Sequence, residues 1–120
     1  MDVDDFKGLN DAHGHMFGDE CLKEIAAVLR SIFGRVGTCY CFGGDEFCVI
    51  MTRNVWEMEN MIGAFNEQLD KRREKNVKIP TVCIGFSGCD TSEKHILDAF
   101  QEADDMLYRA KTEKKSKTYQ

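Results

Sequence analysis

The sequence predicts an α/β sandwich of the ferredoxin-like type, built on a central antiparallel sheet. Its 120 residues, of which 42% are hydrophobic, are enough for one domain with a modest core. Apolar residues recur at helical spacing in several long segments, and two β-prone runs flank a Gly-Gly pair that is typical of a hairpin turn. The resulting order is strand end, helix, strand, strand, helix, strand, helix, which is the split βαβ pattern followed by an additional helix.

Each element has its own signal in the sequence. Asp19 is placed to cap a helix that ends at about Phe33, before Gly34 and Gly37. The basic run Lys71-Arg72-Arg73-Glu74-Lys75 is interpreted as the solvated end of the next helix, and the polar tail after the last helix is predicted to fray. The predicted strands are residues 38–42, 47–51 and 81–87, and the predicted helices are residues 19–33, 55–73 and 92–111. The residues predicted to face the core from the last helix are Ile96, Leu97, Phe100, Ala103, Leu107 and Ala110.

The turn Gly43-Gly44-Asp45-Glu46 presents two acidic side chains beside two glycines. Magnesium prefers oxygen ligands and is usually held by one or two carboxylates together with substrate phosphates. In the predicted order the strand that ends near Asp2 lies beside the hairpin, so Asp2 and Asp45 are expected to meet across the sheet. Taken alone, the turn is better explained as a polar hairpin tip. A calcium loop of the EF-hand type is excluded, because Lys7 and His13 stand where that loop needs Gly and Glu.

Five ordered blocks of sequence carry a resemblance to a known family. The blocks are Asp2-Val3-Asp4-Asp5-Phe6-Lys7; Asn10-Asp11 with Gly14-His15 and Gly18-Asp19; Gly43-Gly44-Asp45-Glu46-Phe47; Thr81-Val82-Cys83-Ile84-Gly85; and Ala103-Asp104-Asp105-Met106-Leu107-Tyr108-Arg109-Ala110-Lys111. Together they closely resemble the GGDEF family of diguanylate cyclases over nearly the whole chain, and the combination is far more specific than any single block. The resemblance implies the palm-type nucleotide-cyclase form of the predicted sandwich.

The resemblance implies a nucleotidyltransferase that condenses two GTP molecules into cyclic di-GMP and releases pyrophosphate. One GTP is expected on each of two facing domains, so turnover requires a homodimer. Asp2 and Asp45 match the metal-binding carboxylates, and the Val3 carbonyl oxygen is a further ligand. Glu46 matches the neighbouring acid that serves both the metals and catalysis, so Asp45 and Glu46 are the expected catalytic pair. Two Mg²⁺ ions per site, or Mn²⁺, would activate the attacking 3′-hydroxyl group and neutralise phosphate charge.

The resemblance also assigns the residues that bind the substrate. Asn10 and Asp19 match the guanine readers, because a carboxylate accepts from guanine N1 and N2 while an amide can donate to the base edge. Lys115 stands where many members carry Arg, which keeps the charge and loses the bidentate geometry. The residues matched to phosphate binding and to packing under the nucleotide site are Phe6, Lys7, Lys111 and Lys115.

Three departures from the family pattern bear on function. Cys41 replaces an Arg that usually precedes the signature, which favours weaker activity. Gly34 and Gly37 occupy the positions of the family's inhibitory Arg-x-x-Asp pair, so no inhibitory product binding is expected there. Residues 1–120 lack the usual N-terminal helix and most of strand one, and are interpreted as an N-terminally truncated GGDEF domain.

The alternative function is a catalytically weak or inactive GTP-binding regulatory module. A third possibility, an interaction domain without a nucleotide role, leaves the acidic and guanine-reading blocks unexplained.

Composition restricts the partners and the compartment. The formal net charge of −5 and the pI near 5.2 argue against non-specific nucleic-acid binding, which depends on Lys and Arg. No apolar stretch approaches the ~20 residues of a membrane-spanning helix. Without a visible export signal, the six cysteines are expected to be reduced and mostly core-filling. The domain is predicted to be cytoplasmic, in a parent protein with a sensor or receiver domain and, in some architectures, a membrane anchor.

Overall fold

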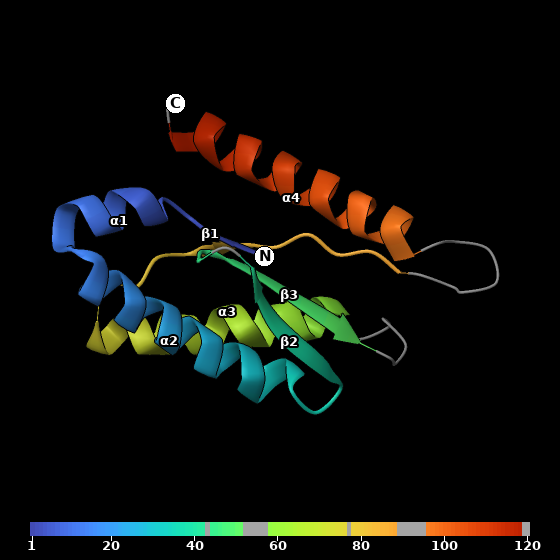
Figure 1. Cartoon of the computed structure of the whole chain (residues 1–120), viewed down its shortest axis with the longest axis horizontal. Helices are drawn as coiled ribbons and strands as arrows, with labels where there is room; N and C mark the ends of the chain where they lie inside the picture. Colours follow the sequence, from blue (N-terminus) through green and yellow to red (C-terminus); the bar gives the residue numbers. More distant parts are fainter. Residues whose placement is uncertain (43, 52–57, 77, 89–95, 119–120) are drawn as a thin grey trace. The chain divides into compact units, whose positions relative to one another are not determined.

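The computed structural model describes residues 1–42, 44–51, 58–76, 78–88 and 96–118 (Figure 1). The chain divides into two compact units. The larger unit is Val3–Thr81, and the smaller unit consists of Met1–Asp2 and Val82–Gln120. Because the boundary falls inside strand β1 (Asp2–Val3), that strand contributes one residue to each unit.

The larger unit is a β-hairpin packed with helices. Its elements are α1 (Phe6–His13), α2 (His15–Phe33), β2 (Gly37–Phe42), β3 (Glu46–Met51) and α3 (Met58–Lys75). Figure 1 shows α2 and α3 side by side, and the rings of Phe33 and Phe65 meet between them with centroids 6.2 Å apart. Arg72 of α3 also forms an ion pair with Glu24 of α2. The buried residues of these two helices include Cys21, Ile25, Val28, Leu29, Phe33, Met58, Phe65 and Leu69.

The predicted hairpin is present. Strands β2 and β3 pair antiparallel as far as the Phe42–Glu46 pair, and each begins one residue earlier than predicted. Gly44 in the turn has a φ of 90°, which glycine adopts without steric strain. At the other end of the hairpin a Cβ on Gly37 would lie 2.5 Å from the carbonyl oxygen of Ile50. The close approach of the two strands at this point therefore requires glycine.

The start of the larger unit differs from the prediction in two ways. Residues 6–13 form helix α1, which the sequence pattern did not indicate, and α2 begins at His15. Gly14, with a φ of 89°, separates the two helices. Asp19 consequently lies inside α2 and does not cap it. The first turn of α2 was not predicted, because His15 and Met16 are exposed and do not belong to the apolar stripe by which the helix was recognised.

The smaller unit contains β4 (Val82–Cys83) and α4 (Ile96–Thr118). Strand β4 is shorter than the predicted strand of residues 81–87. The backbone of Gly85, which follows β4, packs so closely on α4 that a Cβ would clash with the carbonyl oxygen of Ala103. The prediction that the tail frays is also wrong for the described residues, because α4 continues to Thr118.

The core-facing side of α4 also differs from the predicted one. Leu97 and Phe100 are 78% and 55% exposed, whereas Ala99 is buried. The predicted inward positions Ala103, Leu107 and Ala110 are partly buried, and the side chain of Ile96 lies outside the described residues. The inward stripe is therefore shifted toward small residues, which permit the close backbone contact at Gly85.

The predicted α/β class is confirmed by four helices and four strands among the described residues. In the larger unit, Val3 of β1 follows β3 in the strand order β2-β3-β1. Strand β1 is thus a direct neighbour of the hairpin, as the element order predicts. Over the described ranges, no helix combines the length and the apolar character that crossing a bilayer demands.

Candidate functional site

A main-chain hydrogen bond joins β1 to the acidic turn of the hairpin. The Val3 N–H group donates to the carbonyl oxygen of Asp45 at 3.0 Å. Val3 is 2% exposed, Asp45 is half-buried and Glu46 is exposed. The backbone of the turn is therefore anchored while its acidic side chains keep access to solvent. Gly43, the first glycine of the signature, lies outside the described residues.

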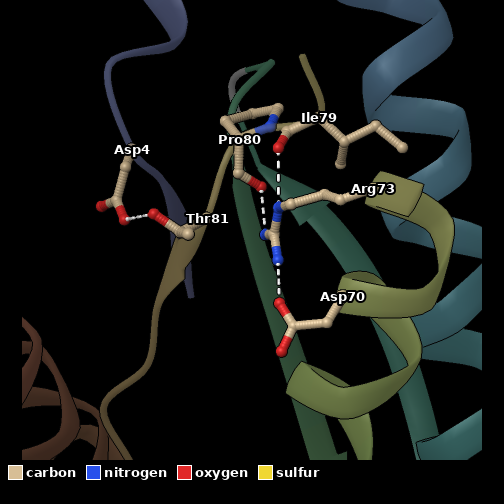
Figure 2. Close-up of polar contacts among 6 residues, drawn as sticks. All are labelled: Asp4, Asp70, Arg73, Ile79, Pro80 and Thr81. Carbon is tan, nitrogen blue, oxygen red and sulfur yellow. Dashed lines mark hydrogen bonds and ion pairs between the residues drawn. The ribbon is translucent and has the colours of Figure 1, made fainter. Parts of the chain in front are cut away.

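The backbone immediately after β1 is held by Thr81. The Asp4 N–H group donates to the carbonyl oxygen of Thr81 at 2.9 Å, and the Thr81 hydroxyl group donates to the Asp4 carboxylate (Figure 2). Thr81 belongs to one of the family-like blocks, but its residue type and spacing indicate no specific role. A threonine at the start of a strand is too common to indicate a specific contact with a residue far away in the sequence.

Arg73 fastens the segment that leads to Thr81 onto helix α3. Its Nε and Nη2 atoms donate to the carbonyl oxygens of Ile79 and Pro80, each at 2.8 Å, and its Nη1 atom pairs with Asp70 at 2.6 Å (Figure 2). The Arg73 side chain is only 20% exposed. The interpretation of the whole basic run as a solvated end is therefore wrong at this residue. Its carbonyl partners lie on the segment after α3, where helical periodicity cannot indicate them.

Helices α1 and α2 bring Phe6 and Asn10 close to Gly18. The Oδ1 atom of Asn10 is buried and has no hydrogen-bond partner among the described residues. A Cβ on Gly18 would clash with this atom and would lie 3.2 Å from Cζ of Phe6. Asp19, the next residue on α2, is exposed. A buried acceptor without a partner is costly, so this atom is a candidate contact for a ligand that carries an N–H group.

In the smaller unit, Asp2 pairs with Lys111 of α4. The Oδ2 atom of Asp2 accepts from the Lys111 ammonium group, while Oδ1 is buried and has no hydrogen-bond partner among the residues described. Asp2 is 9% exposed. A nearly buried carboxylate oxygen without a partner is the type of ligand that a hard cation takes up. The donor chemistry at Asp2 therefore fits a bound Mg²⁺ ion.

The remaining predicted positions are less closely defined. Lys7 is exposed on α1, and the side chain of Lys115 lies outside the described residues. Within the described ranges, the structure does not gather three or more Asp, Glu, His or Cys side chains that could hold a metal by themselves. A cation here would have to combine one or two carboxylates with a carbonyl oxygen and phosphates, which is the usual arrangement for magnesium.

The cysteine near the hairpin differs from the buried thiols. Cys41 is exposed on β2, opposite Phe47. Burial raises the pKa of the Cys21 thiol, and the nearby Glu24 and Glu20 carboxylates act in the same direction. A raised pKa keeps Cys21 in the unreactive thiol form, as expected of a core-filling residue. Cys41 lies two residues before the signature, at the position where the resemblance places an Arg.

Comparison with known proteins places these features in a family. The family model described as "Diguanylate cyclase, GGDEF domain" matches residues 1–117. Diguanylate cyclase VdcA of Vibrio cholerae is 30% identical over 117 residues, a match that covers 92% of this chain and 34% of that protein. Diguanylate cyclase DgcS of Shewanella oneidensis is 30% identical over 114 residues, covering 92% of this chain and 37% of the relative. The chain thus spans about a third of the length of these relatives.

A solved structure shows the same fold. It is the active GGEEF domain of a diguanylate cyclase from Vibrio cholerae, which matches with a TM-score of 0.72 at 30% identity. The match covers 93% of this chain and 73% of that one. The agreement extends over nearly all of the elements described above, so the likeness does not rest on the signature turn alone.

Proposed function

Since this chain belongs to the GGDEF family of diguanylate cyclase domains, we propose that it condenses two GTP molecules into cyclic di-GMP with release of pyrophosphate. The observation that carries the proposal is the hydrogen bond from Val3 to Asp45, which ties β1 to the acidic hairpin turn. It anchors the backbone of the turn while leaving the Asp45 and Glu46 side chains accessible. A turn that served only to connect two strands would not need two carboxylates at such an anchored position.

The residues proposed to hold Mg²⁺ are the carboxylates of Asp2, Asp45 and Glu46 and the carbonyl oxygen of Val3. The buried Oδ1 atom of Asp2, which lacks a partner among the described residues, supports this assignment. When bound, Mg²⁺ or Mn²⁺ would neutralise charge on the GTP phosphates and lower the pKa of the attacking 3′-hydroxyl group. Asp45 and Glu46 are the proposed catalytic residues, because their carboxylates would lie beside the reacting phosphate.

Guanine recognition is assigned to Asn10 and Asp19. The Asn10 amide would donate to an acceptor on the base edge, and the buried Oδ1 atom of the same amide, which has no partner among the described residues, supports a polar ligand at this position. The exposed Asp19 carboxylate accepts from N1 and N2 of the same base. Adenine has no N–H donor at N1, so it would leave the Asp19 carboxylate unpaired and be rejected strongly. The partly buried ring of Phe6, close to Gly18, would support the nucleotide from below.

Phosphate binding is assigned to the ammonium groups of Lys7, Lys111 and Lys115. An ammonium group is a compact charge that binds a phosphate without the bidentate geometry of Arg. The Lys111 ammonium group would exchange its ion pair with Asp2 for a phosphate. Cyclic di-GMP contains two guanylyl groups, so two copies of the domain must face each other, each presenting one GTP. We also propose that the parent protein carries a sensor or receiver domain that controls this pairing, since the relatives are about three times longer than the matched segment.

Incubation with GTP and Mg²⁺, followed by chromatography, tests the cyclase function. The chain should be fused to a dimerising coiled coil, so that failure to dimerise cannot hide activity. We expect cyclic di-GMP and pyrophosphate from GTP, and no cyclic product from ATP. A dimerised chain that binds GTP but forms no product would favour the alternative, a regulatory GTP-binding module. Exposed Cys41, in place of the usual Arg, is the observation that favours this alternative.

Substituting Gly18 by Ala is expected to weaken GTP binding about tenfold, the effect of losing roughly one hydrogen bond to the base. The added Cβ would displace the Asn10 side chain from its present position. Gly63→Ala is the matched control, since it lies on helix α3 with nothing within 4 Å of an added Cβ. Calorimetric titration with GTP would measure both variants. Equal affinity of Gly18→Ala and the unsubstituted chain would contradict the assignment of Asn10.

A further inference from the structure

The peptide group between Val3 and Asp4 has a proposed metal ligand, its carbonyl oxygen, on one side and a hydrogen-bond donor to Thr81 on the other. A peptide unit is planar and trans, so its C=O and N–H groups point in opposite directions. The Val3 carbonyl oxygen is a proposed metal ligand, and the N–H group of the same peptide belongs to Asp4. The hydrogen bond from Asp4 N–H to the carbonyl oxygen of Thr81, 2.9 Å long, therefore also determines where the Val3 carbonyl group points.

Three hydrogen bonds hold this peptide group and its neighbours. The preceding N–H group, that of Val3, is bonded to Asp45 at 3.0 Å, so both sides of the Val3 residue are restrained. The Thr81 hydroxyl group adds a contact to the Asp4 carboxylate (Figure 2). Thr81 thus holds the Asp4 backbone and side chain together, and rotation of the peptide plane would have to break the backbone bond.

Thr81 is in turn held by Arg73. The planar guanidinium group donates to two consecutive carbonyl oxygens, those of Ile79 and Pro80, which lie just before Thr81. The ion pair with Asp70 keeps the guanidinium group in this orientation (Figure 2). Pro80 cannot donate a main-chain hydrogen bond, so the carbonyl contacts to Arg73 are important for locating this segment. Five N–H donors in a rigid fork suit Arg to this task better than Lys.

We propose that the Thr81 hydroxyl group, by binding the Asp4 carboxylate, keeps the Asp4 N–H group on the Thr81 carbonyl oxygen and so positions the metal-binding carbonyl group of Val3, and that Arg73 keeps Thr81 in place. This inference rests on the proposed function, because it concerns the same metal site. Neither side chain touches the nucleotide; both act through the direction of one peptide plane. A positioning role of these two residues predicts weaker metal binding when they are replaced, whereas a purely structural role predicts lower stability without a change in metal affinity.

Mn²⁺ affinity in the presence of a non-hydrolysable GTP analogue tests the proposal without requiring turnover. Thr81→Val keeps the shape and the carbonyl group of Thr81 but removes the hydroxyl group. We expect it to weaken Mn²⁺ binding about three- to tenfold, and Thr81→Ser to restore the affinity. Arg73→Gln should weaken Mn²⁺ binding at least as much, because it releases the whole segment. Titration calorimetry provides the affinities, and thermal melting shows that each variant is folded.

Arg72→Gln is the matched control for Arg73→Gln. It removes the same charge from the preceding residue of α3, but Arg72 pairs with Glu24 and has no hydrogen bond to the carbonyl groups of Ile79 and Pro80. We expect unchanged Mn²⁺ affinity. Mn²⁺ binding by folded Thr81→Val that equals that of the unsubstituted chain would overturn the proposal, even if Arg73→Gln failed to fold.

The same titrations separate this inference from the cyclase function. If the unsubstituted chain binds Mn²⁺ with the analogue but makes no cyclic di-GMP, the cyclase function fails and the Mn²⁺ affinities still decide the role of Thr81. If the chain makes product while all variants keep their Mn²⁺ affinity, the cyclase function stands and the positioning role is wrong. An unsubstituted chain that binds no Mn²⁺ with the analogue would overturn both.

Discussion

Substituting Asp45 by Asn is expected to lower the rate of cyclic di-GMP formation by about 100- to 1,000-fold. The amide has nearly the size of the carboxylate but no charge, so it would hold the metal less well. The metal would stabilise the transition state at the phosphates by several kcal/mol, and this stabilisation would be lost. The Asp45 carbonyl oxygen that anchors Val3 belongs to the main chain, so the hydrogen bond between β1 and the turn remains in the variant. Initial rates at saturating GTP and Mg²⁺ would measure the effect.

The matched control for Asp45→Asn is Glu67→Gln. Glu67 is an exposed carboxylate on α3 and lies outside the proposed site, so the substitution removes the same charge from the surface. Its rate should stay within about twofold of the unsubstituted chain. A similar loss in both variants would show that net charge, and not a ligand, is responsible. Full activity of Asp45→Asn would contradict the assignment of Asp45 as a catalytic residue.

Substituting Phe65 by Ala is expected to lower the free energy of unfolding by about 3–5 kcal/mol. Phe65 is 0% exposed, and its ring meets that of Phe33 with centroids 6.2 Å apart. The substitution removes the apolar contact surface between α2 and α3 and leaves a cavity that the surrounding residues can only partly fill. Urea denaturation followed by circular dichroism would measure the change in unfolding free energy, with the slope m reporting whether the denatured state has changed.

Tyr108→Ala serves as the comparison for Phe65→Ala. It also truncates an aromatic side chain on a helix, but Tyr108 is 73% exposed. The expected change in unfolding free energy is within about 0.5 kcal/mol. If Phe65→Ala destabilised the protein no more than Tyr108→Ala, the packing of α2 on α3 would not be the core of the larger unit.

The elements that the sequence predicted well have local causes. The strands of the hairpin were placed to within one residue, because the signature glycines permit the turn and β-prone residues flank it. Helices α2 and α3 were found through apolar residues at helical spacing, which include Ile25, Leu29 and Phe65. The family followed from five separate blocks in the expected order, and the match over residues 1–117 confirms it.

The predictions were wrong where the hydrophobic pattern of a segment is too short to read or does not match the burial of its side chains in the fold. Helix α1 is only eight residues long, and Phe6 and Leu9 are its large apolar residues, so the segment is too short for a helical period to reveal it. On α4, Leu97 and Phe100 are apolar by composition yet exposed, while the smaller Ala99 is buried. A hydrophobic residue on a helix identifies a candidate for burial, but the neighbouring backbone decides how large the buried side chain can be.

By itself, the sequence determined the family, the acidic hairpin turn and the chemistry of the residues proposed to bind metal and guanine. These follow from residue type and from spacing along the chain. Only the tertiary structure decided that Arg73 turns away from solvent toward carbonyl oxygens, that Thr81 holds Asp4, and that Asn10 needs glycine at position 18. The physical reason is that each of these contacts joins segments whose approach depends on the direction of a backbone group, which residue identity and periodicity do not specify.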